Sequence, residues 1–386
     1  MAYRYLIIGS GFSGCVLAEQ LIKKLDCKIE IWDERNHIGG NSHTERDAQT
    51  NIMLHSYGPH IFNTDKKEIW DYVNSFVEFK PYIHRVKANS KGKIYSLPVN
   101  LYTINQFFNK NFSPIEAKKF LEKSADATIA EPQNFEEQAL RFIGKDLYYA
   151  FFYGYTKKQW GCEPSQLPAA ILKRIPVRFN YDDNYYSNAF SGIPVDGYTA
   201  IMEKMIAHSS IELKLNKNFQ PGINLDKYDH VFYTGPLDAF FNYCYGRLGY
   251  RTVTFKKEYA DGDYQGTSQI NYCDEEVPFT RITEHKHFAP WELHNKTVYF
   301  KEYSKETTAT DIPYYPKRLE ADKALLKLYR VDAEKQTKVS FLGRLATYRY
   351  MDMHHVIDEA IQFAQIFTKC LYERKAFPVF PNVETF

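Results

Sequence analysis

The chain has 386 residues, a formal net charge of +2 and 25% charged residues, so it carries no general excess of positive charge. This balance argues against nucleic acid or an anionic membrane as a partner, and any anion site must therefore be local. The length exceeds what one hydrophobic core usually supports, so we expect two or three sub-domains. No apolar run approaches the roughly 18 residues of a membrane span, and the first strand reaches glycine too early for a signal peptide. We expect a cytoplasmic protein without a membrane span.

The first elements along the chain form a strand, a tight turn and a helix. Residues 4 to 8 are an apolar run, and residues 15 to 25 repeat apolar positions with helical spacing. A second strand, residues 29 to 32, ends in Asp33, which completes a βαβ unit of about the expected 30 residues.

The turn between this first strand and helix predicts a dinucleotide site. Gly9, Gly11 and Gly14 stand in the G-x-G-x-x-G spacing, in which glycines allow a tight turn, close approach to a pyrophosphate and close packing of helix on strand. The helix that follows offers free N–H groups for the phosphates, so Phe12 and Ser13 at its start are also candidate cofactor contacts. Asp33 suits a ribose hydroxyl and disfavours a 2′-phosphate, which argues against NADP.

A second glycine turn follows the acidic residue, at Gly39, Gly40 and Asn41. Nicotinamide dehydrogenases have no need of such a turn, whereas it resembles the flavoprotein pattern in which this turn lies against the FAD pyrophosphate. We therefore expect FAD rather than NAD, with Gly40 and Asn41 among the cofactor contacts.

The middle of the chain is helical and the later part is rich in strands. Residues 101 to about 159 show helical periodicity, with Ser113 suited to cap a helix whose first residue is Pro114. Residues 251 to 303 alternate Thr, Tyr, Phe and Val, as antiparallel strands do. Residues 229 to 236 predict a return to the first sheet.

A final strand and glycine turn at residues 339 to 344 precede a helix over about 353 to 372. Sheet segments near both ends of the chain predict an α/β fold whose FAD-binding Rossmann-like domain is discontinuous and carries two insertions. The expected divisions are residues 1–80, 195–250 and 316–386 for the FAD-binding domain, 100–170 for a helical domain, and 81–99, 171–194 and 251–315 for an antiparallel sheet domain.

The six cysteines are scattered, with no Cys-x-x-Cys pair and no histidine-rich cluster beside them. They are Cys15, Cys27, Cys162, Cys244, Cys273 and Cys370. We therefore expect neither a metal site nor disulfides, and interpret these residues as small buried apolar groups in a reducing compartment.

Long strings in this sequence, taken together, resemble the bacterial UDP-galactopyranose mutases. The similarity extends from about Tyr5 to Ala360 and is carried by residues 35–41, 57–62, 154–161, 172–179, 280–286, 313–316 and 343–353. The resemblance implies an isomerase that interconverts a nucleotide-linked pyranose and furanose without net redox change. Reduced FAD supplies the nucleophile in such a reaction, so an external reductant is needed. A homodimer is left open.

The resemblance also assigns roles to individual residues. Arg174 and Arg281 match the two arginines that bind the substrate diphosphate, and their planar guanidinium groups suit that task. Tyr315 and Tyr350 match tyrosines near the phosphates. The implied residues at the flavin and sugar are His60, Arg344, Asp352 and Met353.

An aromatic cluster matches the place where the family holds uracil. The implied substrate contacts are Phe151, Phe152, Tyr155, Thr156, Gln159, Trp160, Tyr185 and Asn271. The run from 147 to 152 equally suits the buried face of a helix, and we expect it to be partly both.

Two positions depart from the family pattern. This chain has Asn63 where close relatives usually have His, and His84 where they usually have Asn. Both positions lie at the sugar pocket in the family, so the exchange either changes which sugar hydroxyl is bound or is neutral drift.

The most favoured function is conversion of UDP-galactopyranose to UDP-galactofuranose for cell-surface polysaccharide. The alternatives are a mutase for dTDP-fucopyranose or dTDP-galactopyranose, a flavin oxidase or hydroxylase, and a nucleotide-sugar binder without catalysis.

Overall fold

The computed structural model describes residues 2–169 and 177–381. Its strands, in chain order, are β1 (Tyr3–Ile8), β2 (Cys27–Trp32), β3 (Thr44–Arg46), β4 (Met53–His55), β5 (Phe62–Thr64), β6 (Phe79–Pro81), β7 (Val86–Ser90), β8 (Lys93–Leu97), β9 (Phe190–Pro194), β10 (Ile211–Lys214), β11 (His230–Tyr233), β12 (Tyr250–Asp261), β13 (Gln269–Tyr272), β14 (Arg281–Glu284), β15 (Lys296–Glu306), β16 (Tyr315–Pro316) and β17 (Val339–Phe341). Its α-helices are α1 (Phe12–Lys24), α2 (Lys67–Asn74), α3 (Leu101–Phe108), α4 (Pro114–Ser124), α5 (Phe135–Leu147), α6 (Gly154–Trp160), α7 (Gly197–Ile206), α8 (Leu237–Phe240), α9 (Glu320–Glu334), α10 (Gly343–Ala346) and α11 (Met353–Glu373).

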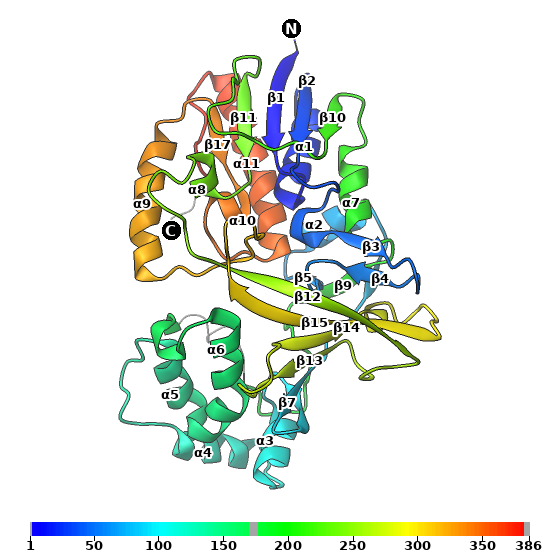
Figure 1. The fold of residues 1–386 in the computed structure, drawn as a ribbon, viewed down its shortest axis with the longest axis vertical. Helices are drawn as coiled ribbons and strands as arrows, with labels where there is room; N and C mark the ends of the chain where they lie inside the picture. Colours follow the sequence, from blue (N-terminus) through cyan, green and yellow to red (C-terminus); the bar gives the residue numbers. More distant parts are fainter. Residues whose placement is uncertain (1, 170–176, 382–386) are drawn as a thin grey trace.

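A five-stranded parallel sheet forms the upper part of the molecule in Figure 1, in the order β10-β2-β1-β11-β17. Its central strand β1 pairs with β2, which follows it closely, and with β11, where Tyr5 lies opposite His230. Strands from the beginning, middle and end of the chain therefore form one sheet. This arrangement confirms the expected α/β fold with a Rossmann-like parallel sheet.

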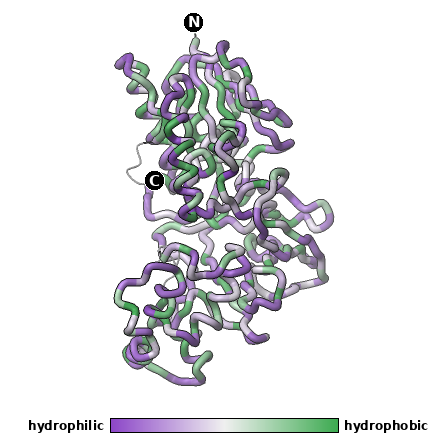
Figure 2. The backbone as a smooth tube through the Cα atoms, turned by 60° about the vertical axis from the view of Figure 1, so that its left-hand side comes forward, coloured by the Kyte–Doolittle hydropathy of each residue, from purple (hydrophilic) through white to green (hydrophobic). Residues whose placement is uncertain are grey.

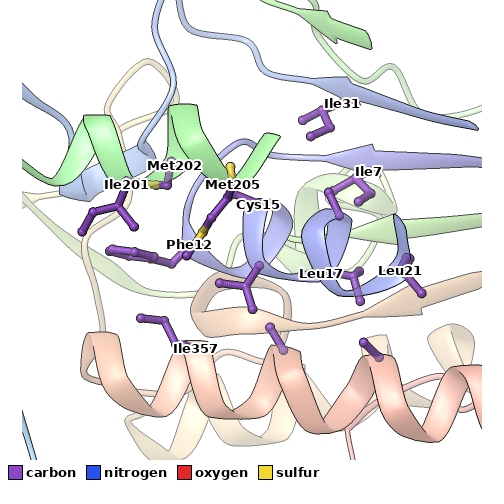
Figure 3. Close-up of a cluster of buried hydrophobic side chains, with 14 of the residues drawn as sticks. Ile7, Phe12, Cys15, Leu17, Leu21, Ile31, Ile201, Met202, Met205 and Ile357 are labelled. Carbon is purple, nitrogen blue, oxygen red and sulfur yellow. The ribbon is translucent and has the colours of Figure 1, made fainter. Parts of the chain in front are cut away.

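The core of this region lies where α1 is covered by α7 and α11 (Figure 3). Helix α1 presents Leu17 and Leu21 to its neighbours with no exposure to solvent, and Ile357 reaches it from α11. Burial of such side chains contributes about 1.5–3 kcal/mol each relative to leaving them exposed. Hydrophobic residues concentrate in the interior of this region and hydrophilic ones on its outer loops (Figure 2).

A seven-stranded sheet crosses the middle of the molecule in the order β16-β12-β15-β14-β13-β7-β8. Its neighbouring strands are antiparallel, as expected for residues 251 to 303, except that β13 and β7 are parallel. The smaller sheets are β5-β9-β6 and β3-β4.

Helices α3 to α6 form the lower part of the molecule in Figure 1. Ser113 caps α4 through the backbone N–H of Glu116, and Pro114 is its first residue, which confirms the expected capping. Helix α5 is interrupted by a non-helical Gly144, and a π-helical segment, Tyr148–Tyr153, joins α5 to α6. Such segments often occur at functional sites.

The cysteines only partly follow the expectation of burial. Cys15, Cys27 and Cys273 are buried, whereas Cys162 and Cys370 are half-buried and Cys244 is exposed. Cys244 lies in a surface turn after α8, where no core element covers it. Across the two described stretches, no helix is both long and apolar enough to cross a membrane.

Candidate functional site

A cavity of about 1750 Å³ runs from the glycine turns at the end of β1 to α6 and β14. Its wall draws on both large sheets, on α6 and on the segment from Arg344 to Val356. Pockets for one drug-sized ligand measure about 300–1,000 Å³. The cavity therefore has room for two ligands of nucleotide size.

The two glycine turns meet at one end of the cavity. A side chain at Gly14 would place Cβ 2.0 Å from the Gly9 carbonyl oxygen, and Gly9 itself has a φ of +105°. The Gly39 amide donates to the Ser10 carbonyl at 3.0 Å, and a Cβ at Gly40 would lie 3.3 Å from the Gly11 Cα. The tight spacing and the positive φ of +54° at Gly40 favour glycine there, and the absence of side chains at Gly11 and Gly40 leaves a bare backbone cradle at the start of α1. Gly14 packs behind the cradle and does not line the cavity.

Asp33 lies beside this cradle at the end of β2, as the sequence predicts. Its Oδ2 accepts hydrogen bonds from the Ser10 amide at 2.8 Å and hydroxyl at 2.6 Å, and its Oδ1 accepts one from the Arg35 amide at 3.0 Å. The carboxylate is therefore fixed in place next to the turn. Phe12, Ser13, Gly40 and Asn41 also line this end of the cavity.

Arg35 is a cavity residue that the sequence reasoning did not select. Its Nη2 donates to Asn41 Oδ1 at 2.8 Å, and its guanidinium carbon lies 4.6 Å from the Tyr57 ring centroid. Its Nη1 is buried and has no hydrogen-bond partner among the described residues. A buried cationic N–H without an acceptor is costly, so this atom suits an anionic ligand oxygen. The available signal was a lone arginine between two glycine turns.

Arg281 occupies the other end of the cavity. Its Nε donates to Glu302 Oε1 at 2.9 Å, and the two side chains are 15% and 2% exposed. Burial favours the neutral guanidine, but the carboxylate of Glu302 outweighs this effect and holds the pKa of Arg281 well above its usual value. The terminal nitrogens of a permanently charged, oriented guanidinium group are well suited to a diphosphate.

Two tyrosines and a second arginine lie between the two ends. Tyr315 and Tyr350 stack with ring centroids 6.1 Å apart, and the Arg344 guanidinium carbon lies 5.4 and 5.6 Å from their centroids. Arg344 also donates from Nη2 to the Tyr314 carbonyl. Burial raises the pKa of Tyr315 to about 12, so its hydroxyl remains a neutral hydrogen-bond donor.

The structure brings His60, Asn63 and His84 to the same cavity. His60 Nδ1 lies 2.7 Å from the Gly58 carbonyl, which can only accept, so Nδ1 carries the proton and Nε2 is an acceptor. Burial lowers the pKa of His60 to about 4. Burial and then the positive charge of Arg281 lower the pKa of His84 to about 3. Both imidazoles are neutral near pH 7.

Asn63 and His84 differ in whether their polar atoms have hydrogen-bond partners. Asn63 Nδ2 donates to the Ile61 carbonyl at 3.1 Å. Within the described stretches, the buried His84 Nδ1 has no hydrogen-bond partner. An unsatisfied buried ring nitrogen in a residue that lines a cavity suits a ligand hydroxyl or amide.

The aromatic cluster divides between the cavity and the core. Tyr155, Gln159 and Trp160 on α6 line the cavity together with Tyr185, and Gln159 Oε1 is a buried acceptor without a partner in the described part of the chain. The remaining members are buried away from the cavity wall: Phe151, Phe152, Thr156 and Asn271. Phe151 and Phe152 therefore belong to a buried helix face, one of the two roles expected for this run, because both pack in the hydrophobic core of the helical region.

The last two predicted residues lie at the start of α11. Asp352 is the residue before its first turn, and both Asp352 and Met353 line the cavity. Arg174 lies outside the described residues. Gln269 and Tyr186 also line the cavity and were not selected from the sequence, because they belong to segments without a motif.

One group of side chains outside the cavity has the composition of a metal site. Asp263, Glu284 and His287 place potential ligand atoms within 4.8 Å of one another. Asp263 is paired with Lys286 at 2.7 Å, and Glu284 accepts the Tyr264 amide at 2.9 Å. These contacts stabilise a surface turn and account for the grouping without a metal.

Comparisons with known proteins agree with this geometry. The family model of UDP-galactopyranose mutase matches residues 150–350, and a model of NAD(P)-binding Rossmann-like domains matches residues 7–76. A probable UDP-galactopyranose mutase of Klebsiella pneumoniae is 54% identical over 97% of both chains. A dTDP-fucopyranose mutase of Escherichia coli is 51% identical over 95% of this chain and 98% of its own.

A solved structure shares the fold. The crystal structure of a reduced UDP-galactopyranose mutase superposes with a TM-score of 0.76 at 15% identity, covering 97% of this chain and 94% of its own. With two relatives above 50% identity over nearly the whole length and a family model that spans half of the chain, the conclusion is direct: this chain belongs to the UDP-galactopyranose mutase family of nucleotide-sugar isomerases.

Proposed function

We propose that this enzyme uses reduced FAD to convert UDP-galactopyranose to UDP-galactofuranose for cell-surface polysaccharide. The carrying observation is that one cavity holds a dinucleotide cradle at one end and a buried cation beside an aromatic helix at the other. A cofactor and a nucleotide sugar can therefore meet inside it.

The residues at the cradle fit FAD. The bare backbone of Gly11 and Gly40 allows a pyrophosphate to approach closely, and Asp33 suits the ribose. Arg35 Nη1 supplies an unpaired donor. When bound, reduced FAD supplies the nucleophile for the anomeric carbon. The chain's own residues must orient the sugar against it and hold the nucleotide that departs and returns.

Arg281 holds the diphosphate in this proposal. It contributes a charge that Glu302 both balances and orients, and the neutral hydroxyl of Tyr315 adds a donor without adding charge. Tyr350 and Arg344 complete the group. Arg174 is proposed as the second diphosphate arginine on the matching family string.

Helix α6 binds the base. The unpaired Gln159 Oε1 accepts the N3–H of a pyrimidine, and the rings of Tyr155 and Trp160 supply flat contacts. Uracil and thymine both carry N3–H. Gln159 therefore suits uracil or thymine rather than cytosine, whose N3 carries no hydrogen, and does not distinguish UDP from dTDP sugars.

His60, Asn63 and His84 contact the sugar. His60 and His84 are neutral near pH 7, so they accept and donate hydrogen bonds without placing a charge beside the anomeric centre. Asp352, at the start of α11, is proposed to lie near the sugar and the flavin ring.

A dTDP-fucopyranose substrate is the second candidate, and a specific observation favours it. The Asn63 and His84 exchange alters the polar groups at this part of the cavity, and one close relative is a dTDP-fucopyranose mutase. A pocket built to bind a hydroxyl rejects an analogue that lacks it strongly, so these residues would decide between galactose and 6-deoxygalactose.

The test is to incubate dithionite-reduced, FAD-loaded protein with UDP-galactose and dTDP-fucose separately and to resolve pyranose from furanose. We expect furanose only under reducing conditions, with the larger kcat/KM for UDP-galactose. A larger kcat/KM for dTDP-fucose would change the proposed substrate to dTDP-fucose, and the assignment as a mutase would stand. Substrate-dependent oxygen consumption with no furanose would establish an oxidase and overturn the proposal.

A further inference from the structure

A half-buried lysine on α6 is surrounded by main-chain carbonyl groups. Lys158 Nζ donates to the carbonyl oxygens of Tyr272 at 2.8 Å, Asp274 at 2.7 Å, Val277 at 2.9 Å and Phe279 at 3.1 Å. No side-chain carboxylate accepts from it among the described residues. An ammonium group has three N–H donors, so the four oxygens enclose the charge as they would a bound cation.

The four carbonyls belong to the last residue of β13 and to the loop that joins β13 to β14, the strand that carries Arg281 at the diphosphate end of the cavity. Asn271 precedes this loop on β13, and Arg281 follows it as the first residue of β14. The Thr280 amide donates to the Glu302 carbonyl at 2.8 Å, so β14 is fixed on β15 independently of the lysine. At the β13 end, the Cys273 amide donates to the Asn89 carbonyl at 2.9 Å, so both ends of the loop are anchored in the sheet and its middle faces α6.

Helix α6 is fitted closely to the same loop. A Cβ at Gly154 would lie 2.3 Å from the Cys273 carbonyl oxygen, so the helix backbone touches the loop directly. The far end of α6 is held separately, because Arg251 Nε and Ser304 Oγ donate to the Gln159 carbonyl at 3.0 and 2.7 Å. Lys158 therefore ties α6 to the segment leading into Arg281 through four main-chain contacts, and Lys157 adds a half-exposed ion pair with Glu275 of the same loop at 3.3 Å.

We propose that Lys158 is a positioning residue, whose ammonium group fastens α6 to the 272–279 loop and so sets the distance between the base-binding face of α6 and Arg281. The inference rests on the proposed function, because it assigns Tyr155 and Gln159 to the base and Arg281 to the diphosphate. A nucleotide must reach both at once. Lys158 itself contacts neither ligand.

The physical reason is electrostatic. Four carbonyl dipoles that point at one centre repel each other unless a cation lies between them, so loss of the ammonium group opens the loop. Burial also lowers the pKa of Lys158 to about 8. Because β14 stays paired with β15 and the end of α6 is held by Arg251 and Ser304, the displacement falls on the loop and on the start of α6. The base contact of Tyr155 then loosens while Arg281 stays beside Glu302.

The decisive variant is Lys158→Ala, with Lys157→Ala as the matched control. Lys157 is the neighbouring residue on α6 and loses the same charge, but it forms half-exposed ion pairs with Glu163 and Glu275. Base contacts made equally in the ground and transition states affect KM rather than kcat. We expect KM and the Kd for UDP to rise about tenfold or more in Lys158→Ala, with kcat within about threefold of the parent. Lys157→Ala should change neither.

Chemical rescue separates positioning from general damage. Propylammonium replaces the atoms that the alanine variant lacks, whereas tetramethylammonium has no N–H donor. We expect propylammonium alone to restore the low KM and the protection of amides 272–280 against hydrogen exchange. Unchanged KM in Lys158→Ala, or a raised KM with no response to propylammonium, would overturn the proposal.

Two further measurements keep the test decisive. If Lys158→Ala does not fold, Lys158→Met fills the space without a charge and should show the same rise in KM with no response to propylammonium; normal KM there refutes the role. The hydrogen-exchange result needs no substrate. If the unmodified protein converts neither sugar, the proposed function fails, and rescue of loop protection still reports on the contact.

Discussion

Replacing Arg281 with alanine should separate the stability of the fold from the chemistry of the site. Arg281 Nε and Glu302 Oε1 are 2.9 Å apart, and both side chains are largely buried. Removing one partner of such a pair costs about 3–5 kcal/mol because the other charge stays buried. Glu302 retains a donor in Thr280 Oγ1 at 3.3 Å, so we expect about 3 kcal/mol.

A second substitution should restore stability but not turnover. Glu302→Gln in the Arg281→Ala background removes the buried charge, and we expect the free energy of unfolding to recover to within about 1 kcal/mol of the parent. Turnover should stay roughly ten- to a hundredfold low in both variants, since a lost charged hydrogen bond costs about 1.5–3 kcal/mol. Arg85→Ala, which breaks an exposed pair with Asp183, should cost less than about 1 kcal/mol.

The assay combines urea unfolding at saturating FAD with kcat/KM of the reduced enzyme, because bound cofactor shifts apparent stability. A double variant as unstable as Arg281→Ala would show that the buried charge of Glu302 is not the cause. Near-parental kcat/KM in Arg281→Ala would place the diphosphate elsewhere in the cavity.

Three further predictions follow from the geometry of the cavity. Gly14→Ala should abolish flavin retention, since its Cβ would lie 2.0 Å from the Gly9 carbonyl oxygen. The FAD released on denaturation, measured by absorbance, should fall below a tenth of the parent's, and a tenfold loss of affinity corresponds to about 1.4 kcal/mol. A fully yellow variant would contradict this prediction. The double variant Asn63→His, His84→Asn should raise the ratio of kcat/KM for UDP-galactose to kcat/KM for dTDP-fucose, whereas either single change should lower activity on both sugars. If the effects of the two single changes simply add in the double variant, the exchange is neutral drift. Acidification below about pH 6.5 should lower the free energy of unfolding, because burial strongly depresses the folded-state pKa values of five histidines, so the unfolded chain binds more protons there. Each contributes about 1.4 kcal/mol per pH unit; urea titrations at pH 7.5, 6 and 5 measure this, and a flat profile would refute it. The five are His55, His60, His84, His230 and His285.

Local patterns made much of this fold predictable. The β1, α1 and β2 unit, Asp33 at its end and the long helix α11 follow from apolar periodicity and glycine spacing within stretches of about 30 residues or fewer. The capped start of α4 follows from the pair Ser113 and Pro114 in the same way.

Contacts between distant segments were beyond such reasoning. The acceptors of Lys158 lie 114 to 121 residues away along the chain. The spacing of apolar residues in α6 does not indicate that this lysine contacts them. The parallel pairing of β13 with β7 inside an antiparallel sheet is likewise a tertiary choice. Phe151 and Phe152 show the remaining ambiguity, because an aromatic run suits a core as well as a ligand.

The parallel sheet also dictates the timing of assembly during synthesis. Strand β1 is synthesised long before its partner β11, which begins at residue 230, and before β17, which begins at residue 339. Until then one edge of β1 presents unpaired amide and carbonyl groups, and α1 lacks its cover from α11, a combination that favours aggregation. A nascent chain shorter than about 350 residues also lacks the wall formed by Arg344 to Val356. A cofactor that contacts this wall can therefore be enclosed only after residue 356 has been made, whereas the free edge of β1 is covered earlier, once β11 has been synthesised.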